Sequence, residues 1–216
     1  MKKTIIFLLS FAICSIAFAQ NDKYIAAMKK AVAQVDTART LDDFKAAGNM
    51  FERIANAEKN QWLPYYYHAY CQVMSAVDVM NHGDLKATVP YLDKAQESID
   101  VAKKLLPDNS EIVTMQGYIY QGRIWENPMI KGAKYGPKSS GVLDKAIELD
   151  PNNPRAYYVK GQGIFYTPAF FGGGADNAKP FLEKAKELYE KEERTDGLSP
   201  TWGSFYNNYL LKEANK

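Results

Sequence analysis

The sequence has few of the residues that form metal and catalytic centres. Only two cysteines and two histidines occur among 216 residues. His68 and His82 are not accompanied by cysteines or acidic residues at the ligand spacing of a zinc site. No Gly-x-Ser-x-Gly elbow and no His-Glu-x-x-His motif is present either. We therefore predict no metal site, no cofactor and no catalytic residue.

An excess of charge of one sign is also missing. The 27 lysines and arginines nearly balance the 25 aspartates and glutamates. Nucleic-acid binding requires clustered basic side chains that displace counterions from the phosphates. We therefore predict no nucleic-acid partner, and no binding to an anionic membrane driven by net charge.

The one long apolar run lies at the N-terminus. Lys2 and Lys3 precede the apolar residues 5–19, which end in Ala17-Phe18-Ala19. This pattern is typical of a secretory signal peptide, and the run is shorter than the about 20 residues of a spanning helix. We predict a signal peptide over residues 1–19, cleavage after Ala19, a periplasmic or secreted protein, and no stable membrane insertion after cleavage. A retained membrane anchor is the minor alternative.

The predicted cleavage removes Cys14 and leaves Cys71 as the single cysteine of residues 20–216. No intramolecular disulfide can then form, so packing must stabilise the fold. Ile13 stands where lipid attachment to Cys14 would require a small residue, and we predict no lipid anchor. Cys71 lies in an apolar helical stretch, where a free cysteine is usually buried.

Helical patterns fill residues 20–216, which we expect to form one all-α domain. Apolar residues recur with a period near 3.6, and no segment alternates as a strand does. Helix starts are indicated by two capping boxes, Thr40 with Asp43 and Asp108 with Glu111, and by Asn153 before Pro154. The predicted helices are 22–37, 41–58, 63–80, 86–105, 109–124, 138–149, 154–166, 175–192 and 199–213.

A small-residue signature occurs three times, as Tyr65-x2-His68-Ala69-x2-Gln72, Val113-x2-Gln116-Gly117-x2-Tyr120 and Tyr157-x2-Lys160-Gly161-x2-Ile164. A ladder of apolar and small residues follows each copy, as Ala95-x3-Ile99-x2-Ala102, Ser139-x3-Leu143-x2-Ala146 and Ala178-x3-Leu182-x2-Ala185. The pattern resembles the tetratricopeptide repeat (TPR), in which a small residue of helix A lets a neighbouring helix approach closely. The resemblance implies a right-handed solenoid of helical hairpins.

The last predicted helix, 199–213, has no partner and is expected to cap the stack. Trp202, Phe205, Tyr206, Tyr209 and Leu210 give it one apolar face. A solenoid end exposes apolar surface unless a terminal element covers it, so we expect this face to pack on the preceding hairpin.

Long insertions separate the repeats. The small residues Ala69, Gly117 and Gly161 lie further apart than the about 34 residues of a standard repeat. The extra residues fall between helix A and helix B, around 81–84, at 121–138 and at 167–176. We therefore expect three insertions on one edge of the stack, where surface loops can carry binding residues. Their Tyr-Gly-Pro and Phe-Gly-Gly-Gly sequences are similar to those of exported bacterial TPR-like proteins.

The third insertion contains a glycine-rich loop that runs into a helix. It lacks the Gly-Lys-Ser/Thr ending of a P-loop, and Asp176 would repel a phosphate at the helix start. We expect a tight turn that packs Phe170 and Phe171 into the core rather than an anion site.

Aromatic residues are abundant, with 15 tyrosines, 10 phenylalanines and 3 tryptophans. In TPR-like domains the concave groove is lined by helix A positions three before, one after and four after the small residue. The resemblance therefore implies an uncharged, aromatic groove for a protein or peptide partner. The residues predicted to bind this partner are Tyr66, Tyr70, Thr114, Tyr118, Gln121, Arg155, Tyr158 and Gln162.

We predict that the protein is a non-catalytic binding scaffold with this groove as its site. One alternative is an enzyme or enzyme accessory with a small ligand at the insertion loops around Trp125, Tyr135 and the triple glycine. Another is a structural subunit of an envelope assembly. A closed pocket near the loops favours the enzyme, exposed groove tyrosines favour the scaffold, and an apolar outer face favours the subunit.

Overall fold

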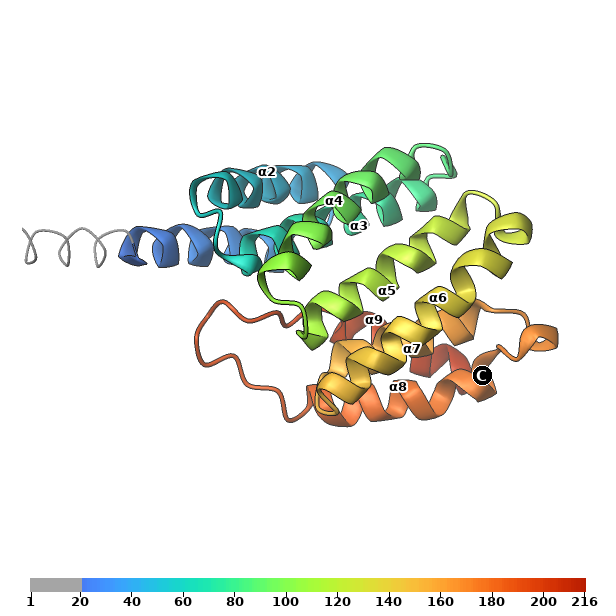
Figure 1. Cartoon of the computed structure of the whole chain (residues 1–216). Coiled ribbons are helices and arrows are strands. Elements are labelled where there is room, and N and C mark those ends of the chain that lie inside the picture. Colours follow the sequence, from blue (N-terminus) through green and yellow to red (C-terminus); the bar gives the residue numbers. More distant parts are fainter. Residues whose placement is uncertain (1–20) are drawn as a thin grey trace, which may run out of the picture.

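Antiparallel helical hairpins stack side by side along the molecule (Figure 1). The structure, a computed structural model, describes residues 21–216, so the predicted signal peptide and its cleavage site lie outside the described residues. After a first helix over residues 21–37, the elements are α2 (Leu41–Ala57), α3 (Trp62–Asn81), α4 (Thr88–Leu105), α5 (Ser110–Trp125), α6 (Pro128–Leu149), α7 (Pro154–Tyr166), the short 3-10 helix η1 (Ala169–Phe171), α8 (Ala175–Tyr189) and α9 (Ser204–Ala214).

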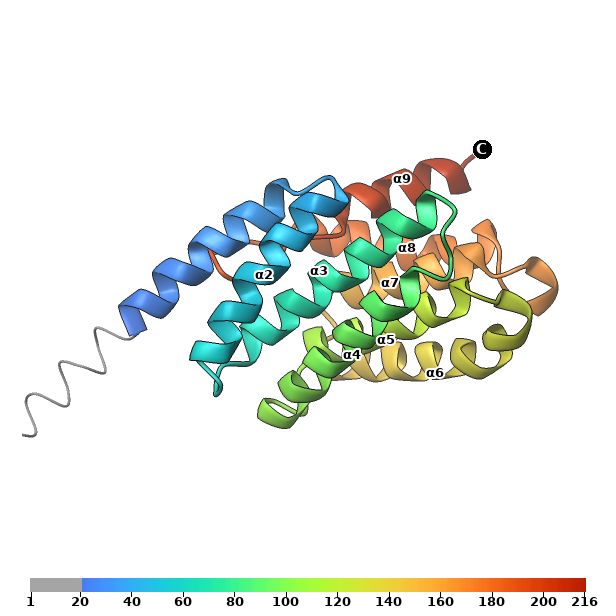
Figure 2. The same cartoon turned by 90° about the horizontal axis from the view of Figure 1, so that it is seen from above.

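The most extensive helix contacts join α3 with α4, α5 with α6, and α7 with α8. The first helix and α2 form a further hairpin, seen at the left of Figure 2. Residues 21–216 contain no strand. The predicted all-α, TPR-like stack of hairpins is confirmed.

The repeated small residues lie where a helix of one hairpin approaches its partner most closely. A Cβ atom on Gly117 would lie 2.6 Å from Cγ of Leu143, and one on Gly161 would lie 2.7 Å from Cδ2 of Leu182. Both distances are shorter than carbon atoms tolerate. The glycines of helix A and the leucines of the helix B ladder therefore form one contact, as the resemblance implies.

Two of the three predicted helix starts are correct. Thr40 and Asp43 form a capping box, and the Asn153 side chain accepts a hydrogen bond from the Arg155 amide at the start of α7. The predicted Asp108 capping box is wrong. Asn109 caps α5 by accepting from the Ile112 amide, which starts the helix one residue later.

The second insertion is mostly helix: α5 ends at Trp125 and α6 begins at Pro128. The predicted start of the next helix at residue 138 is therefore wrong. Asn127 caps α6, with Pro128 in its first turn. Pro137 lies inside α6 and has no N–H to offer the carbonyl of Ala133. Ala133 is exposed, so water can satisfy that carbonyl, and the helix continues through a residue that usually ends one.

The last helix packs on α8 and α7 as a terminal element, but with a different face from the predicted one. Asn207, Leu210 and Leu211 are buried, and the Asn207 amide donates to the Leu182 carbonyl at 2.9 Å. Phe205, Tyr206 and Tyr209 are exposed instead. The aliphatic side of α9 thus covers the stack, and most of its aromatic side faces solvent.

None of the helices in the described part of the chain is both long enough and apolar enough to cross a membrane.

Candidate functional site

The chain covers its own groove. Residues 190–203, here called the C-terminal segment, connect α8 to α9 and place Trp202 against the helices that carry the predicted groove positions. The Trp202 ring stacks on Tyr70 of α3 at 4.9 Å between centroids and on Tyr118 of α5 at 6.0 Å. It meets Tyr158 of α7 edge-on at 6.3 Å. One side chain therefore contacts aromatic rings from three successive helix A elements.

Hydrogen bonds hold the C-terminal segment to this aromatic cluster. Trp202 Nε1 donates to the Tyr66 hydroxyl at 2.9 Å, and that hydroxyl donates to Glu111 Oε2 at 2.7 Å. The Tyr67 hydroxyl donates to the Leu198 carbonyl at 2.7 Å, and the Tyr189 hydroxyl to the Trp202 carbonyl at 3.0 Å. These contacts fix the segment at several points.

A buried ion-pair network supports the start of the segment. Arg155 Nε lies 2.7 Å from Glu111 Oε1, and its Nη atoms lie 2.5 and 3.0 Å from the Glu192 carboxylate. Burial alone would lower the pKa of Arg155, but the charge of Glu111 and the hydrogen bond to Glu192 outweigh it and raise that pKa. The guanidinium therefore stays charged, and it links α5, α7 and the segment.

The tyrosines of the cluster are neutral at ordinary pH. Burial raises the pKa of Tyr118 to about 12, and burial also raises the pKa of Tyr66, Tyr70 and Tyr158 well above the usual value. Ionisation would place a charge where water cannot solvate it, at high cost. These hydroxyls therefore serve as hydrogen-bonding groups, and the rings as apolar surface.

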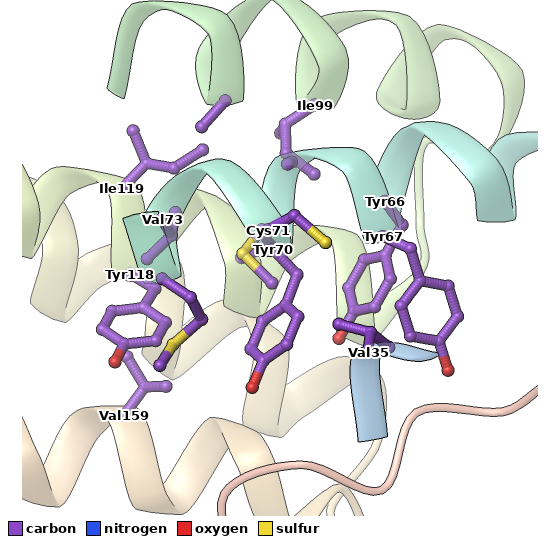
Figure 3. Packing of buried hydrophobic residues seen from close by; sticks show 14 of the residues in the cluster. Val35, Tyr66, Tyr67, Tyr70, Cys71, Val73, Ile99, Tyr118, Ile119 and Val159 are labelled. Atoms are coloured by element: carbon purple, nitrogen blue, oxygen red, sulfur yellow. The ribbon is translucent and has the colours of Figure 1, made fainter. Parts of the chain in front are cut away.

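The predicted groove tyrosines share one side of the helix A layer. In Figure 3, Tyr66, Tyr70 and Tyr118 point away from Ile99, which belongs to α4. All three rings, and that of Tyr158, are buried. The structure thus brings them together as the resemblance implies, but the C-terminal segment occupies the space in front of them.

The other predicted groove residues are also turned inward. Gln121 Nε2 donates to the Val159 carbonyl at 2.7 Å, and Gln162 Nε2 donates to the Tyr158 hydroxyl at 3.1 Å. Thr114 is fully buried, and Arg155 belongs to the ion-pair network. Binding of a partner by this set stays a prediction, and it requires that the C-terminal segment leave.

A pocket of about 550 Å³ remains open at one end of the covered groove. It lies between the end of the first helix, α2, α3 and the start of α9. The residues that line it are Val35, Asp36, Ala38, Arg39, Phe44, Tyr67, Tyr70, Met74, Thr201, Trp202, Gly203, Ser204, Phe205 and Tyr206. Tyr70 is the member of the predicted groove set found in this lining.

Aromatic side chains form a large part of the walls of this pocket. Phe44 meets Tyr70 edge-on at 6.4 Å, and Phe205 meets Tyr206 edge-on at 5.3 Å. The Phe205 side chain is 77% exposed although it lies beside the buried cluster. Such rings offer flat apolar surface to a ligand.

One arginine lies at the rim of the pocket. Arg39 Nη1 donates to the main-chain carbonyls of Ala38 and Asp36, at 2.6 and 3.2 Å. The Asp36 carboxylate is engaged by Arg194, at 2.6 Å. The charge of Arg39 also acts on the Asp43 carboxylate, but Asp43 accepts its hydrogen bonds from the main-chain amides of Arg39 and Thr40. The Arg39 guanidinium can therefore still attract a carboxylate of a bound ligand.

Part of this pocket could not be recognised in the sequence. The apolar pattern of Trp202, Phe205 and Tyr206 predicts packing of the last helix rather than binding. Arg39 and Phe44 lie outside the repeat positions that the resemblance assigns to the groove. Only the folded chain places them beside Tyr70.

The insertion loops place Trp125, Tyr135 and the two phenylalanines in different surroundings. Trp125 and Tyr135 are half-buried, and Tyr135 packs at 5.9 Å from Tyr120. The prediction that Phe170 and Phe171 pack into the core is wrong, because they are 91% and 74% exposed. The turn is tight, as expected, but it directs both rings outward.

The histidines and the cysteine have structural surroundings. His68 Nδ1 lies 2.7 Å from the Ser98 hydroxyl, and burial lowers the pKa of His68. Cys71 is buried, as predicted, and burial raises the pKa of its thiol. Within residues 21–216, no group of three or more His, Cys, Asp or Glu side chains is placed to hold a metal ion.

No family model and no curated protein matches this sequence. Among solved structures, the HusA haemophore from Porphyromonas gingivalis is similar, with 32% sequence identity and a TM-score of 0.79 over 88% of this chain and 92% of that one. A thermophilic TPR protein of Thermus thermophilus is similar with 16% identity and a TM-score of 0.56, over 88% and 91% of the two chains. The second likeness shows the TPR-like fold.

Proposed function

Because this chain belongs to the family of the HusA haemophore, we propose that it is a non-catalytic binding protein for haem. Haem is a flat, conjugated ring with two carboxylate groups at one edge. The ligand would be cargo that the protein holds and releases, and the aromatic pocket beside Trp202 would be its site.

The observation that carries this proposal is the combination of exposed aromatic walls with a cationic rim. A volume of about 550 Å³ is within the range of ordinary ligand pockets. Phe205 and Tyr206 offer ring faces that the core of the protein does not use. Arg39 belongs to the lining and could pair with a carboxylate at the edge of the ligand.

The lining of this pocket contains no histidine. Its sulfur and hydroxyl groups that can ligate iron belong to Met74, Tyr67, Tyr70 and Tyr206. The Tyr67 hydroxyl is engaged by the Leu198 carbonyl and Tyr70 is buried, which leaves Met74 and Tyr206 as the candidates. Most of the binding free energy would therefore come from burial of the flat ring against aromatic side chains.

Export is part of the proposal. The predicted signal peptide would bring the protein to the periplasm or beyond it, where a carrier of a poorly soluble ligand is useful. A peptide partner on the groove tyrosines remains a competing prediction. It would need the C-terminal segment to be displaced from Trp202 and its neighbours, whereas the pocket is open as the chain stands.

The test is a titration of the processed protein with haem, followed by Soret absorbance and by quenching of tryptophan fluorescence. We expect saturable binding to the parent chain. A Phe205→Ala/Tyr206→Ala variant should bind at least about 30-fold more weakly, because truncating a central binding residue costs about 2 kcal/mol or more. Arg39→Gln should weaken binding by about tenfold and reduce its dependence on salt.

The control is Phe170→Ala/Phe171→Ala, which removes two exposed rings that do not belong to the lining of the pocket. It should bind haem like the parent chain. Haem binding that is unaffected by the pocket variants, in proteins whose circular dichroism is unchanged, would show that the site is elsewhere.

A further inference from the structure

At the edge of the stack where α5 and α7 end and α6 and α8 begin, four large side chains without a polar group are exposed, beside Tyr166 at the end of α7, which is 67% exposed. Met129 is 92% exposed and Ile130 is 73% exposed at the start of α6, and Phe170 and Phe171 of η1 are exposed to a similar degree. We call these four residues the apolar edge. Figures 1 and 2 both show η1 and the start of α6 at the same end of the molecule. Several large apolar side chains exposed at one end of a molecule are candidates for an interaction surface.

The loop that carries the two phenylalanines is held in a defined conformation. The Phe171 amide donates to the Pro168 carbonyl and the Gly174 amide to the Ile164 carbonyl, both at 2.9 Å. Gly173 lies so close to Thr167 that a Cβ atom would be 2.0 Å from the Thr167 carbonyl oxygen. The outward direction of the rings is therefore built into the turn.

Residues of a different chemistry lie next to the apolar edge. Trp125 and Tyr135 are half-buried at the end of α5 and in α6. Lys134 and Lys138 are exposed on α6, and Lys134 Nζ lies 5.0 Å from the centre of the Tyr135 ring. Apolar side chains at the tip, with tryptophan, tyrosine and lysine behind them, follow the order of environments from the acyl chains to the headgroups of a bilayer.

We propose that the apolar edge docks the protein reversibly onto the surface of a lipid bilayer. Phe170, Phe171, Met129 and Ile130 would enter the acyl boundary, and the two lysines would meet headgroup phosphates. These four side chains project from η1 and from the start of α6, so they can enter a deformable surface such as a bilayer without a matching cavity. Docking of this kind needs no spanning helix, in agreement with the helices of the described chain.

This surface is separate from the ligand pocket. In Figure 2, α9 runs from the turn between the first helix and α2, where the pocket lies, towards the end of the molecule that carries the apolar edge. A docked protein would therefore keep the pocket away from the lipid, and the inference does not depend on the identity of the ligand.

The test is flotation of the processed protein with vesicles of phosphatidylethanolamine alone and with added phosphatidylglycerol. We expect the parent chain to float with both, and more strongly with phosphatidylglycerol because of Lys134 and Lys138. Phe170→Ser/Phe171→Ser should lower the partition coefficient by about tenfold or more, since each ring contributes a large apolar area. Met129→Ser/Ile130→Ser should lower it by a smaller factor.

Leu105 and Leu106 provide the matched control. They are an exposed apolar pair where α4 ends, and Figure 2 shows this end of α4 on the side of the molecule away from η1. Leu105→Ser/Leu106→Ser should therefore float like the parent chain. All variants are compared by circular dichroism first. The proposal is wrong if the parent chain stays with neither vesicle type, or if the folded Phe170→Ser/Phe171→Ser variant floats as well as the parent. Self-association of a parent chain that does not float would assign the apolar edge to a protein contact instead.

Discussion

The aromatic cluster around Trp202 and the phenylalanine pair of η1 place the same kind of side chain in opposite surroundings. Tyr70, Tyr118 and Tyr158 are covered by Trp202, whereas Phe170 and Phe171 meet each other edge-on and are otherwise 91% and 74% exposed. The first group lies on regular helices and the second on a short glycine-rich turn. The exposure of the two groups differs because the C-terminal segment folds back over the cluster tyrosines and not over the phenylalanines.

Aromatic residues have two different roles in this protein. In the cluster, rings and hydroxyls satisfy one another and stabilise the fold, as the bonds from Trp202 to Tyr66 and from Tyr66 to Glu111 show. At the apolar edge, the two phenylalanine rings contact each other but stay mostly exposed, although the hydrogen bonds of their turn are well formed. Unused apolar area that a structure holds in place is better explained by binding than by stability.

The largest expected effect comes from alkaline pH. The pKa of Tyr118 is raised to about 12 in the folded chain, and that of the other cluster tyrosines is raised as well. The unfolded chain ionises near pH 10, so the stability from these groups is complete below about pH 10 and is lost as the pH rises towards 12 and above. We expect cooperative unfolding in this range.

Tyrosinate absorbance near 295 nm and far-ultraviolet circular dichroism would be followed together through the alkaline titration. The absorbance of the buried tyrosines should appear in the same step as the loss of helix. Ionisation of every tyrosine well before the helix signal falls would show that the cluster is open to solvent.

The next largest effect is expected for Trp202→Ala. The ring contacts three tyrosines and donates a hydrogen bond, and truncating such a side chain costs about 3–5 kcal/mol of unfolding free energy. Phe205→Ala is the control, because its ring is mostly exposed and its loss should cost about 0.5 kcal/mol or less. Urea unfolding measures both, and equal effects would contradict the assigned role of Trp202.

The smallest change in unfolding free energy is expected at the glycine contacts within the helical hairpins. Gly117→Ala forces a Cβ atom against Leu143 and should cost about 1–3 kcal/mol through overpacking, from which a helix propensity gain of about 1 kcal/mol is subtracted. Gly141→Ala in α6 meets no atom within 4 Å and should stabilise by up to about 1 kcal/mol. Thermal unfolding of the two variants should therefore shift in opposite directions, and shifts of the same sign would mean that Gly117 is not a close contact.

The regular part of the fold could be predicted from short-range signals. Gly117 and Gly161 lie opposite Leu143 and Leu182, each only one helix away in the chain, and that spacing is characteristic of a helical hairpin. The same register placed Tyr66, Tyr70, Tyr118 and Tyr158 on one side of the helix A layer. Local periodicity is sufficient for both results.

The covering of the groove could not be predicted in this way. The bond between Tyr66 and Trp202 joins residues that are 136 positions apart, and residues 190–203 have no periodic pattern that aims them at α3, α5 and α7. The outward turn of Phe170 and Phe171 depends on glycine backbone geometry, with Gly172 and Gly174 at positive φ. The sequence shows that glycines are present, but it does not show in which direction the neighbouring phenylalanine rings point.

Hydrogen exchange with and without haem tests most directly whether the ligand occupies the pocket beside a seated C-terminal segment. Amides at residues 35–44 and 201–209 should become more protected when haem binds, while residues 190–200 keep the protection that they have in the free protein. Faster exchange of residues 190–203 on binding, with new protection at Tyr118 and Tyr158, would contradict this and show that the ligand replaces Trp202 in the groove.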